Sequence, residues 1–463
     1  MTMRKRLTPF FIAAPVVLTA ATLAAGVWPG SEQQSPPAQA PQQQSDIVIS
    51  LAEPGARPRY AVPDFIARSS DAETADAAKM LGGVLWDDLA YEREFYMVPR
   101  DTYKTIPSAA SMQAVPFDRW KELGADGLVQ GSIEKTGPAA YRVEVRLFDV
   151  RSGRAVYSRQ YDGTTANPRL FAHTAADEIH LHQRALRGVA RTKLTFSSDR
   201  GGEAMAGTIR ERGAKDIYIS DYDGANQRRV TVTRTLNLYP QWSPDSRTIS
   251  YTSYSTGFPD IVLARIYDGV NERPLGGKFQ SWLAAWSPDG TRICFTATRD
   301  GNAELYVVNR DGSNLRRLTN NPAIDSTPTW SPAGNQIAFT SDRAGAPQIY
   351  IVDVDGLNIQ KLTSESYCDR PTWSPAPFNE IAYEARTGPG YDIKVINVAT
   401  REVRQLTFGQ GSNESPAFSP NGRHLVFSST RSGKRQIYTM ARDGQGVKQI
   451  TTVGANQTPD WSK

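Results

Sequence analysis

Short stretches in which apolar and polar residues alternate fill the chain from about residue 193 to its end. Gln336 to Ser341 is one such stretch, and Gln348 to Asp353 is the next. A period of two places every second side chain on the same face, which is typical of a β-strand. Turn sequences separate the stretches, because Asp-Gly favours a tight hairpin and Ser-Pro-Asp-Gly favours a second turn. The pattern predicts many short antiparallel strands.

These strands belong to a repeat that is marked by an aromatic residue followed by serine. The markers are 43 to 45 residues apart, at Trp242, Trp286, Trp330, Trp373, Phe418 and Trp461. Each unit supplies four strands, and so small a sheet cannot bury its own faces, so neighbouring sheets must stack radially. The repeat therefore predicts an all-β, six-bladed β-propeller over residues 191–463, with the aromatic residue packed between adjacent blades.

The first and last units of the repeat are incomplete. The first begins at Lys193 without an aromatic-Ser strand, and the last has only the strand around Trp461. The simplest closure places Trp461 in the same blade as Phe196 and Ile217, because that arrangement leaves no open sheet edge.

Residues 41–190 lack the repeat and predict a small α/β domain, which makes the protein multidomain. A helix is expected over residues 70–94, with Asp71 as its cap and with Ala78, Leu81, Leu85 and Leu89 on one side. Further helices are expected over residues 117–123 and 168–187. Strands are expected over residues 46–51, 59–62, 96–98, 127–134, 141–148 and 155–161.

Residues 1–40 have the order of a secretory signal followed by a disordered junction. Arg4, Lys5 and Arg6 precede an apolar run over residues 10–27, and a stretch rich in Gln, Pro, Ser and Ala follows. Export would place the mature chain in the periplasm. An uncleaved anchor helix is the alternative, because the apolar run is nearly long enough to span a bilayer.

The charge of the chain does not favour nucleic-acid binding, and its cysteine content does not indicate a disulfide framework. The net charge of the 463 residues is +5, and no dense block of Lys and Arg is present. The two cysteines are expected to be unpaired, Cys294 in a buried strand and Cys368 in a connecting loop.

Because the sequence contains no recognisable catalytic motif, we expect that the protein is not an enzyme and has no cofactor. Neither a Gly-x-Ser-x-Gly elbow, a P-loop nor a His-Glu-x-x-His motif is present. His173, His180 and His182 have no convincing carboxylate partner nearby in the sequence, so no metal site is predicted there. Asp-x-Asp-Gly at Asp221 and Asp353 imitates a calcium loop but lacks the following Glu. The alternative that loop carboxylates hold an ion in the propeller channel stays open.

Polar segments directly before the aromatic-Ser strands are the best candidate for recognition. We expect them to form loops that gather at one mouth of the channel, with Tyr239 and Trp282 as anchors. In the alternative, Asp, Asn and Ser in these segments only make local turn bonds before Pro. The residues predicted to contact a folded partner are Gln280, Leu283, Asp325, Ser326, Asp369, Arg370, Asn413 and Glu414.

The order of these parts resembles the TolB family of the Tol-Pal system. The resemblance rests on the signal, the small α/β domain and the six repeats. It extends to the helix over residues 172–178, the junction over residues 188–193 and the repeat over residues 339–345. It spans essentially the whole exported chain.

The resemblance implies a periplasmic component that supports outer-membrane integrity and invagination during cell division. It implies that the propeller mouth binds the Pal lipoprotein through segments matching residues 280–283 and 325–326. Gln280 and the Trp282-Leu283 pair depart from the usual family residues. It also implies that the extended N-terminal segment binds TolA, which here corresponds to Asp46, Ile47, Val48, Ile49, Ser50 and Leu51.

The protein is expected to be a monomer and peripheral to the outer membrane through Pal. Two other functions stay open, an accessory role to a hydrolase and the binding of glycans.

Overall fold

The computed structural model describes residues 57–203 and 213–463. The predicted TolA-binding strand over residues 46–51 and the predicted signal over residues 1–40 lie outside the described residues. In the described part, no helix is both long enough and apolar enough to cross a membrane.

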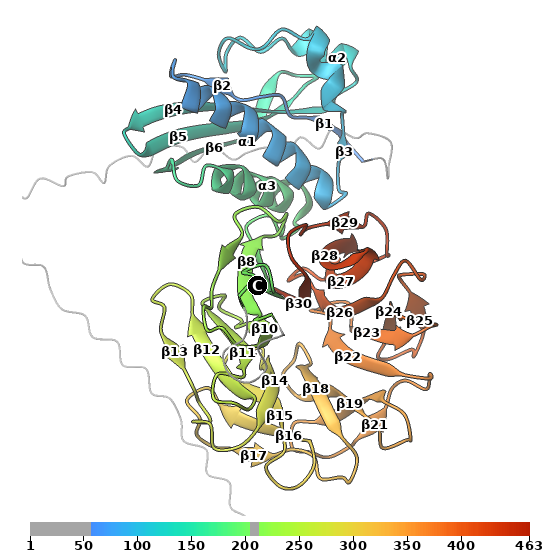
Figure 1. Ribbon diagram of the computed structural model, residues 1–463. Coiled ribbons are helices and arrows are strands. Elements are labelled where there is room, and N and C mark those ends of the chain that lie inside the picture. The colour runs from blue at the N-terminus through green and yellow to red at the C-terminus, as the bar shows by residue number, and fades with distance from the viewer. Residues whose placement is uncertain (1–56, 204–212) are drawn as a thin grey trace, which may run out of the picture. The chain divides into compact units, whose positions relative to one another are not determined.

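The first folded region is a mixed sheet with two long helices on one face. The sheet has the order β3-β1-β4-β5-β6, and β2 also pairs with β4. Its strands are β1 (Arg59–Ala61), β2 (Ile66–Ala67), β3 (Tyr96–Met97), β4 (Gly127–Gly137), β5 (Ala140–Asp149) and β6 (Arg154–Thr164). The helices are α1 (Ala72–Tyr91), the 3₁₀ helix η1 (Arg100–Thr105), α2 (Phe117–Glu122) and α3 (Arg169–Arg184). Figure 1 shows α1 and α3 side by side along the sheet.

The boundaries of α1 and α3 follow from local chemistry. Asp71 caps α1 as predicted, because its carboxylate accepts a hydrogen bond from the Thr74 amide at 3.0 Å. α3 ends at Arg184, three residues earlier than expected, because Ala185 takes the left-handed conformation with φ of 50°. β2 and η1 were not predicted from the sequence, because both are too short to carry a periodic pattern.

The second region is a propeller of six four-stranded sheets, which confirms the predicted fold class (Figure 1). We number the blades from the one that closes the ring. Blade 1 contains β30 (Asn456–Trp461), β7 (Lys193–Ser198), β8 (Asp216–Asp221) and β9 (Arg228–Arg229). Blade 2 contains β10 (Asn237–Trp242), β11 (Thr248–Ser253), β12 (Asp260–Arg265) and β13 (Asn271–Glu272). Blade 3 contains β14 (Ser281–Trp286), β15 (Arg292–Ala297), β16 (Glu304–Asn309) and β17 (Arg316–Arg317).

The remaining blades continue the same four-strand order. Blade 4 contains β18 (Asp325–Trp330), β19 (Gln336–Ser341), β20 (Gln348–Asp353) and β21 (Gln360–Lys361). Blade 5 contains β22 (Cys368–Trp373), β23 (Glu380–Arg386), β24 (Tyr391–Asn397) and β25 (Val403–Gln405). Blade 6 contains β26 (Asn413–Phe418), β27 (His424–Ser432), β28 (Lys434–Ala441) and β29 (Lys448–Gln449).

The ring closes as predicted, because the C-terminal strand completes blade 1. β30 pairs antiparallel with β7, so that Trp461 lies opposite Leu194 and Asn456 lies opposite Ser198. Closure leaves the inner strand of blade 1 paired, although it comes from the far end of the chain.

The aromatic residue before serine packs between blades, as predicted. Trp330 of blade 4 belongs to a buried cluster with Ala285 and Leu305 of blade 3. Its indole N–H donates to the carbonyl of Ala285 at 3.0 Å, so the ring both fills the space and satisfies its polar atom.

Candidate functional site

One mouth of the propeller channel is built from the first halves of the six inner strands. The predicted loops are therefore wrong, because these polar segments are part of β10, β14, β18, β22, β26 and β30. Each inner strand has a register shift after its second residue. The third residue takes a left-handed conformation with φ between 49° and 56°, at Tyr239, Leu283, Thr327, Arg370, Ser415 and Thr458. Such a bulge redirects the side chain, and here all six line one cavity at the channel.

The first residue of each inner strand faces into the blade. Asp325 and Asn413 are both buried. Asp325 accepts two hydrogen bonds from Arg343, at 2.9 and 2.7 Å, and Asn413 accepts one from Arg431 at 2.8 Å. We therefore correct their assignment as surface contacts, because their side chains hold the blade together. Cys368 occupies the equivalent position in β22 and is also buried, so its prediction as a loop thiol is wrong.

The arginine that bonds Asp325 is Arg343, which stands in the Asp-Arg-Ala-Gly loop over residues 342–345. Arg343 lies over the rings of Phe339 and Tyr350, 5.4 and 5.0 Å from the ring centroids. Cation–π contact and the paired carboxylate together explain why this loop carries arginine.

Two of the other predicted contact residues, Leu283 and Arg370, line the cavity at the mouth. Gln280 is exposed, and Leu283, Ser326, Asp369, Arg370 and Glu414 are partly exposed. Asp369 accepts hydrogen bonds from Thr340 at 2.8 Å and Thr327 at 3.1 Å, which ties blade 5 to blade 4. The mouth therefore combines accessible polar and apolar groups on a rigid support, which suits protein recognition.

Arg370 crosses the channel and narrows it. Blades 2 and 5 face each other in a ring of six, and the Arg370 guanidinium of blade 5 lies 4.7 Å from the centroid of the Tyr239 ring of blade 2. Arg370 also donates to the Tyr239 hydroxyl at 3.3 Å. The cavity that remains among these side chains is about 90 Å³, room for a few water molecules.

Two carboxylates beside this cavity bind protons unusually tightly. Burial raises the pKa of Glu384 to about 7, although Arg370, 3.8 Å away, opposes this shift. Burial likewise raises the pKa of Asp460 to about 7, although its carboxylate accepts a hydrogen bond from the Trp242 amide at 2.7 Å. The charge of the channel therefore changes near neutral pH.

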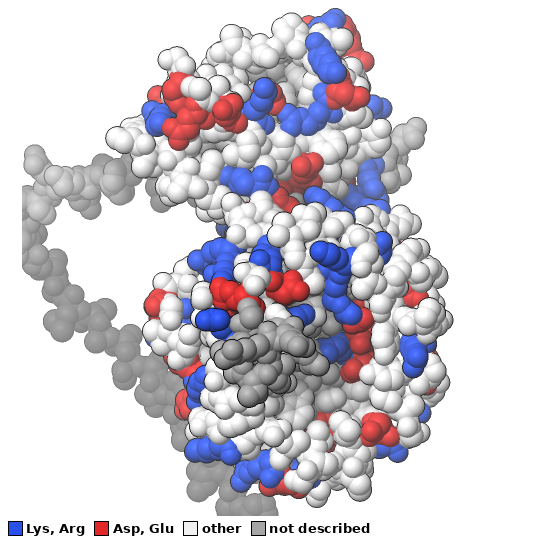
Figure 2. Space-filling model, in the orientation of Figure 1, with Lys and Arg blue, Asp and Glu red and all other residues white. Residues whose placement is uncertain are grey.

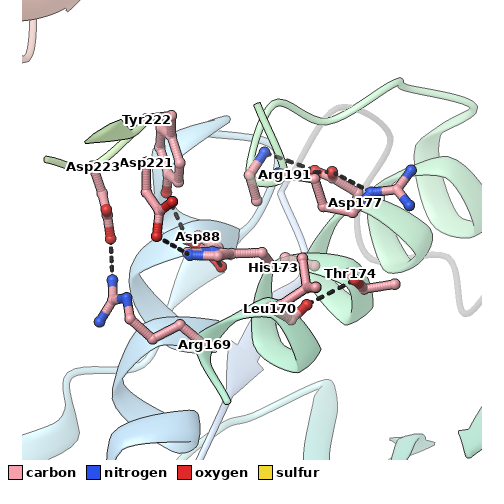
Figure 3. A network of polar contacts seen from close by, with 12 residues as sticks. Asp88, Arg169, Leu170, His173, Thr174, Asp177, Arg191, Asp221, Tyr222 and Asp223 are labelled. Carbon is pink, nitrogen blue, oxygen red and sulfur yellow. Dashed lines mark hydrogen bonds and ion pairs between the residues drawn. The ribbon is translucent and has the colours of Figure 1, made fainter. Parts of the chain in front are cut away.

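A second polar cluster lies where α3 and α1 contact blade 1 (Figure 3). His173 Nδ1 lies 2.8 Å from Asp88 Oδ2, and the Tyr222 hydroxyl donates to Asp88 Oδ1 at 2.6 Å. His173 Nε2 lies 3.8 Å from Asp221 Oδ2. No carboxylate was predicted near His173 from the sequence, because Asp88 and Asp221 are distant along the chain and only the fold brings them together.

Acidic and basic side chains are interspersed over the face shown in Figure 2, without a broad basic surface.

Two family models match the chain. Residues 46–156 match the TolB amino-terminal domain, and residues 185–388 and 365–463 match the TolB beta propeller domain. The matched segments follow the two folded regions of the structure.

Curated relatives and a solved structure give the same result. The Tol-Pal system protein TolB of Desulfosudis oleivorans is 32% identical over 236 residues, which cover 49% of this chain and 51% of the relative. That of Cereibacter sphaeroides is 30% identical over 260 residues, which cover 56% of this chain and 54% of the relative. The chain thus spans about half the length of the curated relatives it matches. The crystal structure of TolB from Acinetobacter baumannii superposes with a TM-score of 0.72 at 25% identity, covering 88% of this chain and 97% of that chain.

Proposed function

Because the chain belongs to the TolB family, we propose that it is a periplasmic, non-enzymatic, protein-binding component of the Tol-Pal envelope complex. It binds the Pal lipoprotein through the propeller mouth and TolA through Asp46 to Leu51. It acts as a monomer, peripheral to the outer membrane through Pal, and supports outer-membrane integrity and invagination during cell division.

The observation that carries this proposal is the construction of the mouth. Six bulged inner strands converge on one channel and present Leu283, Ser326, Asp369, Arg370 and Glu414 with partial exposure. Asp325 and Asn413 support these residues from inside the blades. Side chains that are fixed before binding lose little conformational entropy when a partner docks.

The test of the mouth uses purified partner and a matched pair of substitutions. Leu283→Ser lies at the mouth, and Leu357→Ser lies in the exposed turn between β20 and β21, where Leu357 is 62% exposed. Isothermal titration with Pal should show about tenfold weaker binding for Leu283→Ser and unchanged binding for Leu357→Ser. A wild-type chain that binds no Pal, or equal effects of the two substitutions, would contradict the proposal.

The TolA assignment is tested by deletion of residues 46–51. The full chain should bind TolA, and the shortened chain should not, because an extended segment adds main-chain hydrogen bonds to a partner's sheet edge. Repeating both titrations with Pal present tests for a switch, whose coupling is typically about 1–3 kcal/mol and must be reciprocal. Equal TolA affinity of the two chains would contradict the assignment of this segment.

A further inference from the structure

Three carboxylates surround the imidazole of His173 at the contact between α3 and blade 1 (Figure 3). Asp88 comes from α1, Asp221 is the last residue of β8, and Asp223 lies in the turn that follows. The side chains of His173, Asp88 and Asp221 are each at most 2% exposed, and Asp223 is 14% exposed. Three possible ligand atoms, one each from His173, Asp221 and Asp223, lie within 4.8 Å of one another.

The imidazole is held by a carboxylate at Nδ1, and its Nε2 lies 3.8 Å from the carboxylate of Asp221. Asp88 faces Nδ1 at 2.8 Å, and Asp88 itself is fixed by the Tyr222 hydroxyl at 2.6 Å. His173 Nε2 is buried and has no hydrogen-bond partner within the described residues, and it points towards Asp221. A carboxylate behind the remote nitrogen of a histidine is the usual support of a metal-binding imidazole, because it fixes the tautomer and raises the basicity of the ligand.

We propose that His173 Nε2, Asp221 and Asp223 bind a divalent transition metal ion, with Zn²⁺ as the best match, and that Asp88 positions the imidazole. One nitrogen and two carboxylate oxygens suit zinc, which accepts four ligands and leaves the last place to water. Calcium and magnesium prefer sites made of oxygen atoms alone. The site goes beyond partner binding, because it would join α1 and α3 to blade 1 through a metal ion.

Two basic side chains compete for the same carboxylates. Lys193 pairs with Asp221, and Arg169 pairs with Asp223. Lys193 is 36% exposed and Arg169 is 24% exposed, so each can turn towards solvent when the ion enters. Removal of the competing ammonium group of Lys193 is therefore expected to strengthen metal binding.

The first experiment measures zinc on the full, tag-free chain after equilibrium dialysis against zinc chloride. We expect about one zinc ion per chain, because a single four-coordinate site binds one ion. His173→Ala should lose this ion. His182→Ala is the matched control, because His182 is an exposed histidine of the same helix and should leave binding unchanged. Absence of stoichiometric zinc from the wild-type chain, or its retention by His173→Ala, would overturn the proposal.

A second set of variants keeps the test decisive if His173→Ala does not fold. Asp223→Asn removes a ligand at the edge of the cluster and should abolish stoichiometric binding. Asp88→Asn removes the support behind the imidazole and should weaken binding about 10–100-fold. Lys193→Met should bind zinc several-fold more tightly than wild type. Equal or weaker zinc binding by Lys193→Met would show that Asp221 is not a ligand and that the cluster is a set of ion pairs.

Discussion

Blades 1 and 6 differ from blades 3 to 5 in what they pack against. Residues of blades 1 and 6, including Phe196, Trp461 and Val426, share one buried cluster with Leu89 of α1 and Ile179 of α3. Blades 3 to 5 instead form separate clusters, each shared between neighbouring blades. One side of the ring is therefore fused to the core of the α/β region, while the other side depends on the repeat alone.

The same division holds for buried charge. In blades 3 and 4, buried carboxylates pair with arginine residues of the same blade, as Glu304 does with Arg317 at 2.8 Å and Asp325 does with Arg343 at 2.7 Å. In blade 6 the partner is distant, because Glu92, which follows α1, contacts His424 at 3.2 Å and Arg423 at 3.3 Å. Equivalent blades therefore bury charged groups by different means, through local pairs in blades 3 and 4 and through long-range pairs in blade 6.

The largest expected effect comes from removing the strand that completes blade 1. Deletion of residues 457–463 removes nearly all of β30 and exposes the edge of β7, so the free energy of unfolding should fall by more than about 4 kcal/mol. Urea denaturation followed by tryptophan fluorescence measures this change. Deletion of Lys463 alone is the control and should cost little, whereas equal stability of the longer deletion would contradict the closure.

The next effect tests the long-range pairs of blade 6. Glu92→Ala leaves His424 and Arg423 without their buried carboxylate, and loss of one partner of a buried pair typically costs about 3–5 kcal/mol. Thermal unfolding by calorimetry should show a clear decrease in Tm. The control is Glu122→Ala, since the Glu122 side chain is 62% exposed and its loss should change stability by no more than about 0.5 kcal/mol.

A smaller effect depends on pH and concerns the channel. Asp460 has a pKa raised to about 7 in the folded chain, so folding takes up a proton between about pH 4 and pH 7. The contribution of this group to stability therefore decreases as pH rises through that range and is constant above it. Asp460→Asn keeps the oxygen that accepts from the Trp242 amide and removes the buried charge.

Asp460→Asn should therefore be more stable than wild type by about 1–3 kcal/mol at pH 8 and nearly equal to it at pH 4. Denaturant titrations of both chains at the two pH values measure this difference. A constant difference between the chains across this range would show that Asp460 does not titrate as described.

The smallest effect concerns an exposed pair that also joins the α/β region to blade 6. Arg93 lies 3.3 Å from Asp443, and the side chains are 36% and 53% exposed. Arg93→Ala should cost at most about 1 kcal/mol, because water screens such a pair. If Arg93→Ala lowered the free energy of unfolding as much as Glu92→Ala, the energy of these pairs would depend on their place between the α/β region and blade 6 and not on their burial.

The sequence by itself determined the propeller, its six blades and its closure. The period of two, the turn residues and the aromatic-Ser marker are local signals, and each blade is a short continuous segment except blade 1. The helix from Asp71 and the antiparallel strands β4 to β6 were predictable for the same reason. Alternation and capping act over a few residues, so their pattern is visible in the chain.

Tertiary structure alone decided which polar residues are available and which are buried. Asp325 and Ser326 are neighbours in the sequence, yet Asp325 is buried on Arg343 while Ser326 is partly exposed, because a bulge in the strand sets their directions. No sequence motif links Asp88, His173 and Asp221, which are far apart along the chain. Their meeting depends on how α1 and α3 pack against blade 1, a contact between distant segments that no local pattern specifies.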